Sequence, residues 1–365
     1  MIVANDVVHD SRVLKEARAL RDAGHEVSFI GWDRSGKAPA TEDRGGIVIR
    51  RVRTRGALRA VPTTTLRNPL WWRLAYRIAR TMPFDVVHCH DLDALPIGVR
   101  LKGKFRKPLV YDCHEVFGYM IEHDVPRFVT RYAFRLERRL SRHADRVIAV
   151  NEYVKAYVDP VSGHDSVVIR NCSDQIEQTY RAPPAAPFTL LYVGTLHASR
   201  FVLEAIDAVA TMPDVRLVIG GSKSLTPLVR EKCSRWPNTQ FVGTVPNERV
   251  LPMTVESHAV LSMFDPRHRI NRVGLPNKIF EAMAAGRPCI ATEGLPMSSL
   301  LIREQCGIAV PYTQEGFRVA VEKLREDPAF AERLGRNGLD AAHREYNWRH
   351  ESKNLLALYD GFMSS

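Results

Sequence analysis

Short apolar strands that alternate with helical segments run along the whole chain, and this pattern limits the fold more than any other feature. In the first half the apolar segments are "MIVA", "EVSFIGW", "GIVIRRV", "FDVVHCH", "PLVYDCH", "DRVIAVN" and "SVVIRN". In the second half they are "FTLLYVGT", "VRLVIGGS", "TQFVGTV", "AVLSMF", "RPCIAT" and "GIAVPY". The alternation predicts parallel βαβ units, and 365 residues suit two α/β domains better than one ordinary core.

A proline- and alanine-rich segment, "RAPPAAP", divides the chain almost in half. It can form neither a helix nor a central strand, so it predicts an interdomain linker. We expect a first Rossmann-like domain over residues 1–181, the linker over 182–187 and a second Rossmann-like domain over 188–345. The amphipathic segment 346–365 is expected to form a helix that packs back on the first domain. Ligands of such open parallel sheets bind at the carboxyl ends of the strands.

The net charge of +11 is concentrated in one window of the sequence. Residues 51–150 hold 20 Lys and Arg against 9 Asp and Glu, so this window accounts for the whole excess. A basic face can bind nucleic acid, an anionic membrane surface or an acidic substrate. The sequence has neither a strand platform of aromatic and basic residues nor a helix-turn-helix, which argues against nucleic acid.

Two segments of the basic window have the pattern of helices that bind anionic lipid. In "RNPLWWRLAYRIARTM", residues 67–82, arginines separate tryptophan, leucine, isoleucine and methionine. The same apolar stripe would form equally well if the helix packed on the sheet with its arginines in solvent. The second segment, "RFVTRYAFRLERRLSRH", would extend the basic face.

Cysteine usage and hydropathy indicate where the protein works. The six cysteines are scattered, without close pairs or histidines at zinc spacing, which argues against a disulfide framework or a zinc site. No apolar run approaches the roughly 18–20 residues of a membrane span, and "MIVANDVVHD" lacks the pattern of a signal peptide. We expect a cytoplasmic protein, at most peripheral on the inner face of the cell membrane.

Polar residues cluster where the expected strands end. Asn5 and Asp6 follow the first strand, and "HCHD" and "YDCHE" end two others. Strand alternation places His88 and His90 on one face and Cys89 on the other. We expect one of the two histidines to be packed, and His90 to be the one at the ligand site.

In their order and spacing these motifs resemble the GT-B glycosyltransferases of family 4, which are retaining and use sugar nucleotides. The resemblance rests on "DSRVLKEARALRDAGHEVSFIGWD", "FDVVHCHDLDALPIG", "LVYDCHEVF", "ADRVIAVNEYV", "LLYVGTLHASRFVLEAIDAV", "LVIGGS", "FVGTV" and "LPNKIFEAMAAGRPCIAT". It implies two Rossmann-like domains that face a central cleft. The first domain would bind the acceptor and the second the nucleoside-diphosphate sugar.

The resemblance also implies roles for individual residues of the second half. Glu281 matches the glutamate that binds the nucleotide ribose, at a helix whose N-terminus meets the diphosphate. Arg200 matches the cation that holds the diphosphate and stabilises the leaving group. The glycine and serine of the "GGSK" loop are expected to bind the donor at positions 222 and 223. The other implied donor-binding residues are Gly194, Thr195, Arg200, Gly243, Asn277, Lys278 and Glu281.

For the first half the resemblance implies a positional role for His114, which matches the family's histidine against the transferring sugar. His114, Arg200 and Glu281 are thus the expected catalytic residues. The residues expected to bind the acceptor are Asp10, Arg12, His90, Asp91 and Glu115. Structural roles remain open for several: His114 as a hydrogen-bonded histidine at a strand end, Glu281 and Lys278 as helix-surface residues.

The implied activity is transfer of a hexose, with a UDP-sugar as the expected donor, in cell-surface polysaccharide or glycolipid assembly. The acceptor hydroxyl would attack from the face of the leaving group, with the donor phosphate assisting proton removal, so neither a metal nor a cofactor is expected. Two alternatives stay open: a small soluble natural-product acceptor, and an inactive nucleotide-sugar-binding homologue. The spacing from "PNK" to "EAMAAG" argues against a UDP-GlcNAc 2-epimerase.

Three positions depart from the family pattern. Val273 stands where many members have a second glutamate that contacts the sugar, and Thr195 where a basic residue often follows the glycine. The usual Gly-Gly loop after the first strand is replaced by "NDVVHDSR". The "PNK" motif indicates a subgroup in which Lys278 supplies the cation that Thr195 cannot.

Overall fold

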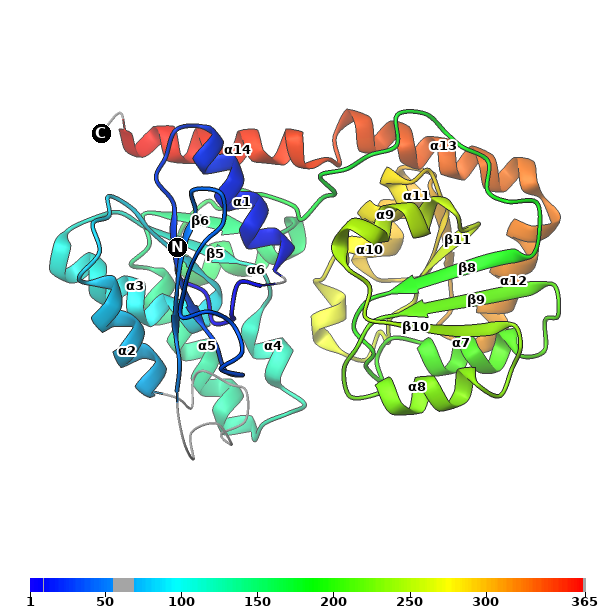
Figure 1. Cartoon of the computed structure of the whole chain (residues 1–365), viewed down its shortest axis with the longest axis horizontal. Coiled ribbons are helices and arrows are strands. Elements are labelled where there is room, and N and C mark those ends of the chain that lie inside the picture. Colours follow the sequence, from blue (N-terminus) through cyan, green and yellow to red (C-terminus); the bar gives the residue numbers. More distant parts are fainter. Residues whose placement is uncertain (9, 55–68, 364–365) are drawn as a thin grey trace. The chain divides into compact units, whose positions relative to one another are not determined.

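The computed structural model describes residues 1–8, 10–54 and 69–363, and these form two compact units (Figure 1). Unit 1 comprises Met1–Asn171 together with Glu351–Ser365, and unit 2 is Cys172–His350. The segment after Asn171 belongs to unit 2 because it bonds there: the Glu177 amide donates to Ala284 (2.9 Å). The expected linker therefore lies inside unit 2 rather than ahead of it.

Unit 1 contains two blocks of strands joined by Ile2. One block has the order β1-β3-β2 and the other β4-β5-β6-β7. Ile2 bridges Ile30 on one side and Cys89 on the other, so the "MIVA" segment connects the blocks through isolated bridges rather than as a full strand. The strands are β1 (Ser28–Trp32), β2 (Thr41–Asp43), β3 (Val48–Val52), β4 (Val87–His90), β5 (Leu109–Cys113), β6 (Arg146–Ala149) and β7 (Val167–Val168).

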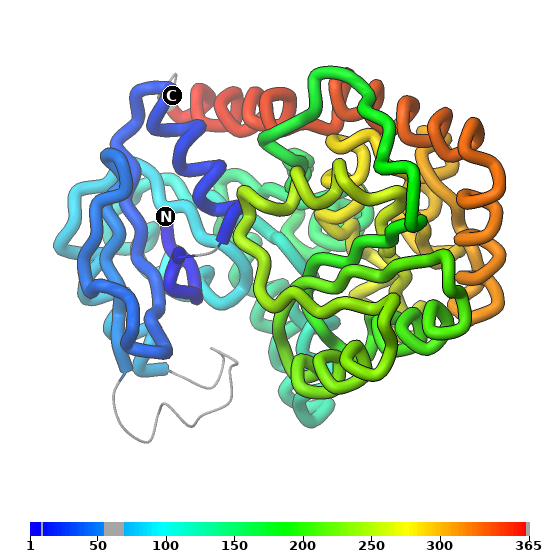
Figure 2. Tube along the Cα trace, turned by 45° about the vertical axis from the view of Figure 1, so that its right-hand side comes forward, coloured from blue at the N-terminus to red at the C-terminus, as the bar shows by residue number. Residues whose placement is uncertain are grey.

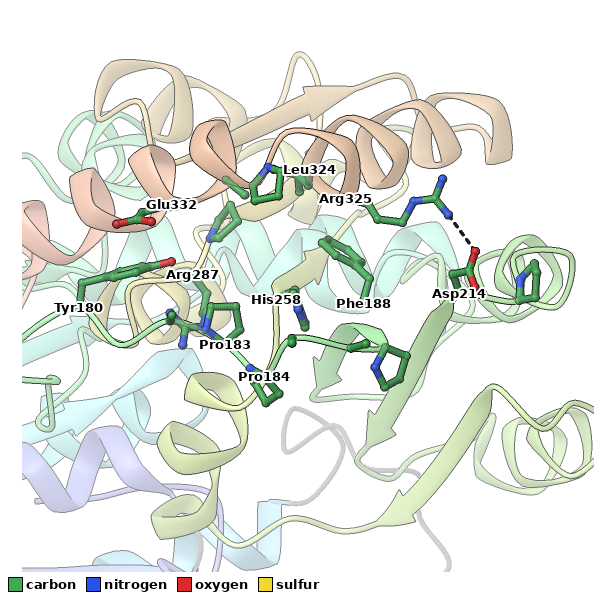
Figure 3. A pocket seen from close by; sticks show the side chains of 18 residues that line it. Tyr180, Pro183, Pro184, Phe188, Asp214, His258, Arg287, Leu324, Arg325 and Glu332 are labelled. Atoms are coloured by element: carbon green, nitrogen blue, oxygen red, sulfur yellow. Dashed lines mark ion pairs between the residues drawn. The ribbon is translucent and has the colours of Figure 1, made fainter.

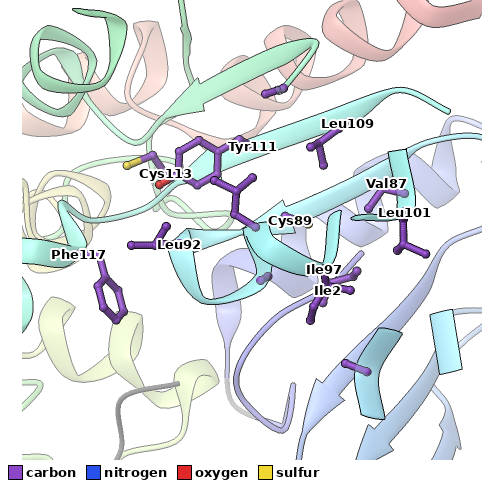
Figure 4. Close-up of a cluster of buried hydrophobic side chains, with 14 of the residues drawn as sticks. Ile2, Val87, Cys89, Leu92, Ile97, Leu101, Leu109, Tyr111, Cys113 and Phe117 are labelled. Atoms are coloured by element: carbon purple, nitrogen blue, oxygen red, sulfur yellow. The ribbon is translucent and has the colours of Figure 1, made fainter. Parts of the chain in front are cut away.

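All strand pairs of unit 1 are parallel except β2 with β3. The helices are α1 (Ser11–Asp22), α2 (Pro69–Ala79), α3 (Asp91–Phe105), α4 (Phe117–Ile121), α5 (Arg127–Ser141) and α6 (Glu152–Ser162), followed after unit 2 by α14 (Trp348–Met363). The hydrophobic core includes Cys89 and Leu109 of the sheet and Leu92, Ile97 and Leu101 of α3 (Figure 4).

Helix α2 uses its apolar stripe for this core. Trp71 is completely buried and stacks on Trp32 with 5.4 Å between ring centroids, and Ala75 and Ala79 are buried on the same side. Of the two explanations for this segment, packing on the sheet accounts for these residues. Arg67 and Asn68, the first residues of the predicted segment, lie outside the described residues.

Unit 2 holds one parallel sheet in the order β10-β9-β8-β11-β12-β13. Numbered within the unit, this is the doubly wound order 3-2-1-4-5-6, which reverses direction between β8 and β11 and leaves a ligand crevice there. The strands are β8 (Phe188–Val193), β9 (Val215–Gly220), β10 (Thr239–Gly243), β11 (Ala259–Ser262), β12 (Cys289–Thr292) and β13 (Gly307–Val310). The predicted class, two doubly wound α/β domains, is confirmed.

Helices cover both faces of the second sheet. In Figure 1, α7 and α8 lie on one side of β8, β9 and β10, and α9, α10 and α11 lie on the other. The helices are α7 (Val202–Val209), α8 (Thr226–Cys233), α9 (Asn247–Val255), the 3-10 helix η3 (Arg269–Arg272), α10 (Asn277–Ala284), α11 (Pro296–Arg303), α12 (Gln314–Glu326) and α13 (Pro328–Arg344).

Helix α14 brings the end of the chain back to unit 1, as the trace in Figure 2 shows. The fully buried Glu351 accepts from the backbone N–H of Arg170 (2.9 Å) and from its Nη1 (2.8 Å). Further along, the Tyr359 hydroxyl lies 2.9 Å from Nδ1 of His88. Within the described residues no helix combines the length and apolar character that crossing a bilayer requires.

Candidate functional site

Three glycine loops close the carboxyl edge of the second sheet. Gly194 follows β8, and its N–H donates to Gly220 (3.0 Å), while the Gly221 N–H donates to Gly243 (2.7 Å). Gly221 has φ +138°, and a Cβ there would lie 1.8 Å from the carbonyl oxygen of Gly194. Only glycine fits that approach. The loops therefore present bare backbone beside the point where the strand order reverses.

The loop after β9 corrects one expectation about the donor site. Its glycine and serine are Gly221 and Ser222, one position earlier than expected, and position 223 is a lysine, Lys223. The carbonyl oxygen of Ser222 accepts from the Leu196 N–H (3.2 Å), which ties two of the loops together. Lys223 is exposed, and its backbone N–H donates to Oγ1 of Thr226 (2.9 Å) at the start of α8. The predicted donor-binding positions 222 and 223 are therefore a serine and a lysine, and the glycine and serine of this loop are residues 221 and 222.

Lys278 lies against the glycine backbone. Its side chain is buried, with Nζ 4.5 Å from the ring centroid of Tyr192, and a Cβ on Gly194 would be 2.6 Å from Nζ. Burial lowers the pKa of Lys278 to about 8; the nearby Glu281 opposes this shift in part, and Arg200 adds to it. Lys278 forms no ion pair in the part of the chain that the structure describes. It is a cation suited to an incoming anion.

Arg200 supplies a second cation at the same place. Its guanidinium stacks 3.8 Å from the Phe264 ring centroid, and Nη1 donates to Oδ1 of Asn271 (2.9 Å). The Lys278 Nζ lies over the same ring at 5.6 Å. Because Asn271 is neutral, it orients the guanidinium without neutralising it.

Helix α10 begins next to these cations. Pro276 is its N-cap, without a side-chain capping bond, and Asn277 is its first residue. Glu281 stands one turn into the helix and is half-buried. Free N–H groups and the helix dipole favour an anion at such an end. A carboxylate one turn further accepts from two vicinal hydroxyls.

Two positions that depart from the family pattern lie around this edge with different exposures. Thr195 is exposed, and its carbonyl oxygen accepts from the Tyr192 hydroxyl (2.6 Å). Val273 ends η3 and is half-buried, so an apolar side chain occupies the position of the family's second glutamate.

Unit 1 has a polar cluster at the carboxyl ends of β4 and β5. His114 Nε2 lies 2.7 Å from Oδ2 of Asp112, and its Nδ1 lies 3.5 Å from Oδ2 of Asp91. Burial alone would lower the pKa of His114, but the two carboxylates outweigh it and raise the pKa to about 9. His114 is thus a cation at neutral pH.

Behind His114 the cluster is closed to solvent. Arg12 donates through Nη2 to Asp112 (2.9 Å) and through Nη1 to the carbonyl oxygen of Ile169 (2.8 Å). Glu16 and Asp112 are completely buried, and His88 and His90 are 1% exposed. The sequence predicts His90 at the ligand site; its side chain is buried here, with Nδ1 turned inward to Asp112 (3.2 Å).

The other residues expected to bind an acceptor are placed as follows. Arg12 is buried and occupied by protein partners, so nothing supports a contact with an acceptor. Asp10 caps α1 by accepting from the Val13 N–H (3.3 Å). Asp91 opens α3 with φ +61°, a conformation Asp tolerates, and accepts from the His114 N–H (3.0 Å). Glu115 is exposed at the end of β5.

Four of these side chains have the spacing of a metal site. One ligand atom each of Glu16, His88, His90 and Asp112 lies within 4.8 Å of the others. Arg12, however, lies against both carboxylates, with Nε 3.0 Å from Glu16. A metal ion would add two positive charges beside a buried guanidinium, so we assign no metal centre here.

Comparison with known families agrees with this architecture. The model of Glycosyltransferase Family 4 matches residues 11–175, and that of Glycosyl transferases group 1 matches residues 187–327. Together they span most of both units. The chain is a family 4 type GT-B glycosyltransferase.

Similar proteins cover the glycosyltransferase from end to end. A glycogen synthase of Mycobacterium tuberculosis is 26% identical over 93% of this chain and 88% of its own length. A phosphatidyl-myo-inositol mannosyltransferase of Mycolicibacterium smegmatis is 25% identical, over 96% and 89%. The crystal structure of Anabaena HepE in complex with UDP-glucose has a TM-score of 0.74 at 15% identity, over 99% and 98%.

The glycosyltransferase also has a large hollow at the amino edge of the second sheet. It has a volume of about 790 Å³ and is lined by residues that precede strands, among them Asp214, His258 and Arg287, and by the proline-rich segment (Figure 3). Arg287 is buried and donates to backbone carbonyls such as that of Val255 (3.1 Å). This edge is opposite to the one where parallel sheets bind ligands.

Several contacts of the glycosyltransferase's polar clusters were missed in the sequence. Glu16 lies four residues after Arg12 on one face of α1, and Asp112 shares the strand face of His114, so spacing could have linked these pairs. Nothing in the sequence connects Asn271 to Arg200. Such contacts depend on the tertiary fold.

Proposed function

We propose that this glycosyltransferase transfers a hexosyl group, with retention, from a UDP-sugar to an acceptor hydroxyl. The observation that carries the proposal is the pair of cations, Arg200 and Lys278, that lie over the same Phe264 ring, with Lys278 also against the Gly194 backbone. A diphosphate has the charge to occupy this place. Glu281, one turn further along the helix, would accept from the ribose hydroxyls.

The chemistry follows from these charges. As the bond between the sugar C1 and the phosphate oxygen breaks, negative charge grows on the diphosphate, and Arg200 and Lys278 stabilise it. The acceptor oxygen bonds to C1 from the same face, and its proton passes to the departing phosphate oxygen. His114, already protonated, is suited to orient a substrate hydroxyl and not to remove a proton.

The identity of the donor rests on similarity. Anabaena HepE, which shares the fold, was crystallised with UDP-glucose. The residues described here would bind the diphosphate and the ribose, which are common to all nucleoside-diphosphate sugars. Uridine is therefore the part of the proposal that needs testing first.

A thermal-shift screen of UDP, GDP and ADP tests the donor site. Ligand that binds only the folded state raises Tm by mass action, so we expect UDP to raise Tm and to lose this effect in Arg200→Ala and Glu281→Gln. Arg235→Gln is the control, because Arg235 is exposed and pairs with Glu231, four residues earlier in the chain. Slow hydrolysis of a UDP-sugar by the native protein alone would show an active enzyme. Absence of both binding and hydrolysis with every donor would favour an inactive homologue and defeat the proposal.

We also propose that no metal ion takes part. Two side-chain cations already offset the diphosphate charge, which is the task of a divalent ion in other transferases. Activity should be unchanged by EDTA and by added Mg²⁺ or Mn²⁺. Loss of activity in EDTA that a divalent ion restores would contradict this.

For the acceptor we propose a phosphate-bearing lipid or lipid-linked glycan at an anionic membrane, in cell-surface polysaccharide or glycolipid assembly. Helix α5 supports this. Its Phe128 is 72% exposed and Tyr132 49%, and Met120 of the preceding helix is 43% exposed. The arginines of α5 form no ion pair with any residue that the structure describes: Arg127, Arg131, Arg135, Arg138 and Arg139. Apolar side chains among arginines are typical of a helix at an anionic lipid surface.

A basic hollow between α2 and α3 adds to this charge. It has a volume of about 580 Å³ and is lined by the arginines Arg73, Arg77, Arg80 and Arg100, with Trp72 and Tyr76 among its other walls. The Arg100 guanidinium stacks on Tyr76 at 4.2 Å. One similar protein is a phosphatidyl-myo-inositol mannosyltransferase, whose name specifies a phospholipid acceptor.

Vesicle co-sedimentation tests the membrane proposal. We expect binding to vesicles with anionic phospholipid, weaker binding as salt rises, and little binding to purely zwitterionic vesicles. Phe128→Ser combined with Arg131→Gln should reduce binding, whereas Arg235→Gln should not. Equal binding to both vesicle types, or none, would favour the alternative of a small soluble acceptor.

A further inference from the structure

We propose that Glu16 and Asp112 are positioning residues for His114, and that Glu16 stays uncharged so that Asp112 alone carries full negative charge behind the ring. The inference deepens the proposed function, on which it rests for the role of His114. It is carried by the geometry of one buried cluster in unit 1.

The guanidinium of Arg12 contacts one oxygen of each of the two carboxyl groups, those of Asp112 and Glu16. Its Nη2 donates to Oδ1 of Asp112 (2.9 Å), and its Nε lies 3.0 Å from Oε1 of Glu16. The second oxygen of each group faces the imidazoles: Oδ2 of Asp112 lies 3.2 Å from His90 Nδ1, and Oε2 of Glu16 lies 3.8 Å from His88 Nε2. Both carboxyl groups thus lie in the same buried site.

Asp112 faces two cations, Arg12 at 2.9 Å and His114 at 2.7 Å, whereas Glu16 faces only one cation of the described residues, Arg12 at 3.0 Å. Two ionised carboxylates in a buried site repel each other, so the one with fewer cationic neighbours retains its proton. Burial alone would raise the pKa of Asp112, but Arg12 and His114 keep it well below its usual range. Burial and the neighbouring Asp112 raise the pKa of Glu16 to about 8. Glu16 is therefore the protonated member.

The unused polar atoms of the cluster agree with this assignment. Glu16 Oε2, His88 Nε2 and His90 Nε2 are buried without a hydrogen-bond partner among the described residues. An ionised Glu16 would leave Oε2 buried without a donor, whereas a carboxylic acid at this oxygen brings a donor of its own. Burial also lowers the pKa of both histidines, which keeps them neutral.

The result fixes the state of His114. Both ring nitrogens face carboxylates, Asp112 at 2.7 Å and Asp91 at 3.5 Å, so the ring donates on both sides as an imidazolium. The groups that surround the ring come from four elements: Arg12 and Glu16 of α1, His90 of β4, Asp91 of α3 and Asp112 of β5. Asp112 orients the ring, and the neutral Glu16 leaves Asp112 free to do so.

Nuclear magnetic resonance of the ring nitrogens of His114 tests this without any substrate. In Glu16→Gln, which replaces a neutral acid by a neutral amide of the same shape, the ring-nitrogen signals of His114 near neutral pH should stay where they are in the native protein. In Asp112→Asn the apparent pKa of His114 should fall by roughly 1–3 units, the usual effect of losing one adjacent opposite charge. The carboxyl-carbon signal of Glu16 in the native protein should lie at the protonated position near neutral pH, and a signal at the ionised position there would overturn the inference.

Infrared spectroscopy gives a second reading that does not depend on the titration. The native protein at neutral pH should show a buried carboxylic-acid band that is missing from Glu16→Gln. Stoichiometric bound zinc or another transition metal in the purified protein would also overturn the inference, since Glu16 would then be an ionised ligand.

Kinetics separate this inference from the proposed function. With a working donor and acceptor, Asp112→Asn should lower kcat at least tenfold. Glu16→Gln should retain most of the native kcat. Glu16→Leu removes the acid group altogether and shows whether a hydrogen-bonding side chain is needed at this position. If no transfer is found for any protein, the proposed function fails, while the carboxyl signals of Glu16 near neutral pH still decide its charge.

Discussion

At the residue scale, each of the two polar clusters contains a cation whose pKa is shifted by its surroundings. Lys278 lies on an aromatic ring and on glycine backbone, and His114 lies between two carboxylates. Their pKa values move in opposite directions, down to about 8 for Lys278 and up to about 9 for His114. Each shift leads to a measurable pH dependence.

The first prediction concerns Lys278 and nucleotide affinity. If Lys278 contacts the diphosphate, Lys278→Gln should weaken UDP binding about tenfold or more, because a hydrogen bond to a charged group contributes about 1.5–3 kcal/mol. The affinity of the native protein should fall as pH rises above about 8, where the free Lys278 loses its proton. Titration calorimetry between about pH 7 and 9.5 measures both effects. A variant with the same pH profile as the native protein would rule out this contact.

The second prediction concerns His114 and stability. Its pKa is raised from 6.5 to about 9, so its charged form stabilises the fold fully below pH 6.5, and the contribution disappears as pH rises through 9. The free energy of unfolding of His114→Gln should thus be lower than that of the native protein by about 2–3 kcal/mol near pH 6, and by much less near pH 9.5. Urea titrations at the two pH values measure it. His123→Gln, at an exposed histidine, should show no such difference.

At the element scale, the loops after β8 and β9 work as one piece because their backbones touch. Gly221→Ala should destabilise unit 2 by about 3 kcal/mol or more, since the added Cβ would meet the Gly194 carbonyl and φ is +138°. Melting curves and UDP titrations should both report the change. Gly103→Ala is the matched control: its Cβ would meet nothing within 4 Å, and we expect a change within about 0.5 kcal/mol.

The strands also show what the sequence could and could not predict. Apolar runs predicted twelve strands at their places, because burial in parallel sheets requires such runs. The exception is β2, "TED", an antiparallel edge strand without apolar residues whose Glu42 pairs with Arg51 (2.6 Å). Hydrophobic periodicity cannot predict a strand such as β2, whose side chains are polar and which is stabilised by an ion pair with the neighbouring strand.

The candidate site could be predicted from the sequence only in part. The resemblance named Arg200, Lys278 and Glu281, which belong to short motifs, and their roles stay predictions. It did not show that Arg12 and His90 are buried and face Asp112, since a motif does not tell whether a polar side chain faces a ligand or another buried charge. The partner of His88 on α14 lies 271 residues away in sequence, beyond any local pattern.

At the scale of the whole molecule, unit 1 is built from two stretches of chain that flank unit 2. Glu351 and Arg170 join the two stretches, and Arg170 also pairs with Glu152. Glu351→Ala should lower the stability of unit 1 by about 3 kcal/mol, the lower end for breaking a buried pair because Glu152 remains.

Chemical unfolding in the presence and absence of UDP can assign this effect. We expect the ligand to shift only the transition of unit 2, and Glu351→Ala to shift only that of unit 1. Glu332→Ala is the control, because that glutamate lies on the surface of α13 and pairs with Arg336. A single transition that both changes move together would mean that the units unfold as one.

The order of these stretches bears on how the protein matures during translation. A ribosome makes the chain from its first residue, and domains generally fold as soon as they emerge. Residues 1–171 must wait, because Glu351 and Tyr359 leave the ribosome only after the whole of unit 2. The nascent first unit would therefore keep part of its surface uncovered throughout synthesis of the second, and a chain truncated before Glu351 would leave it so.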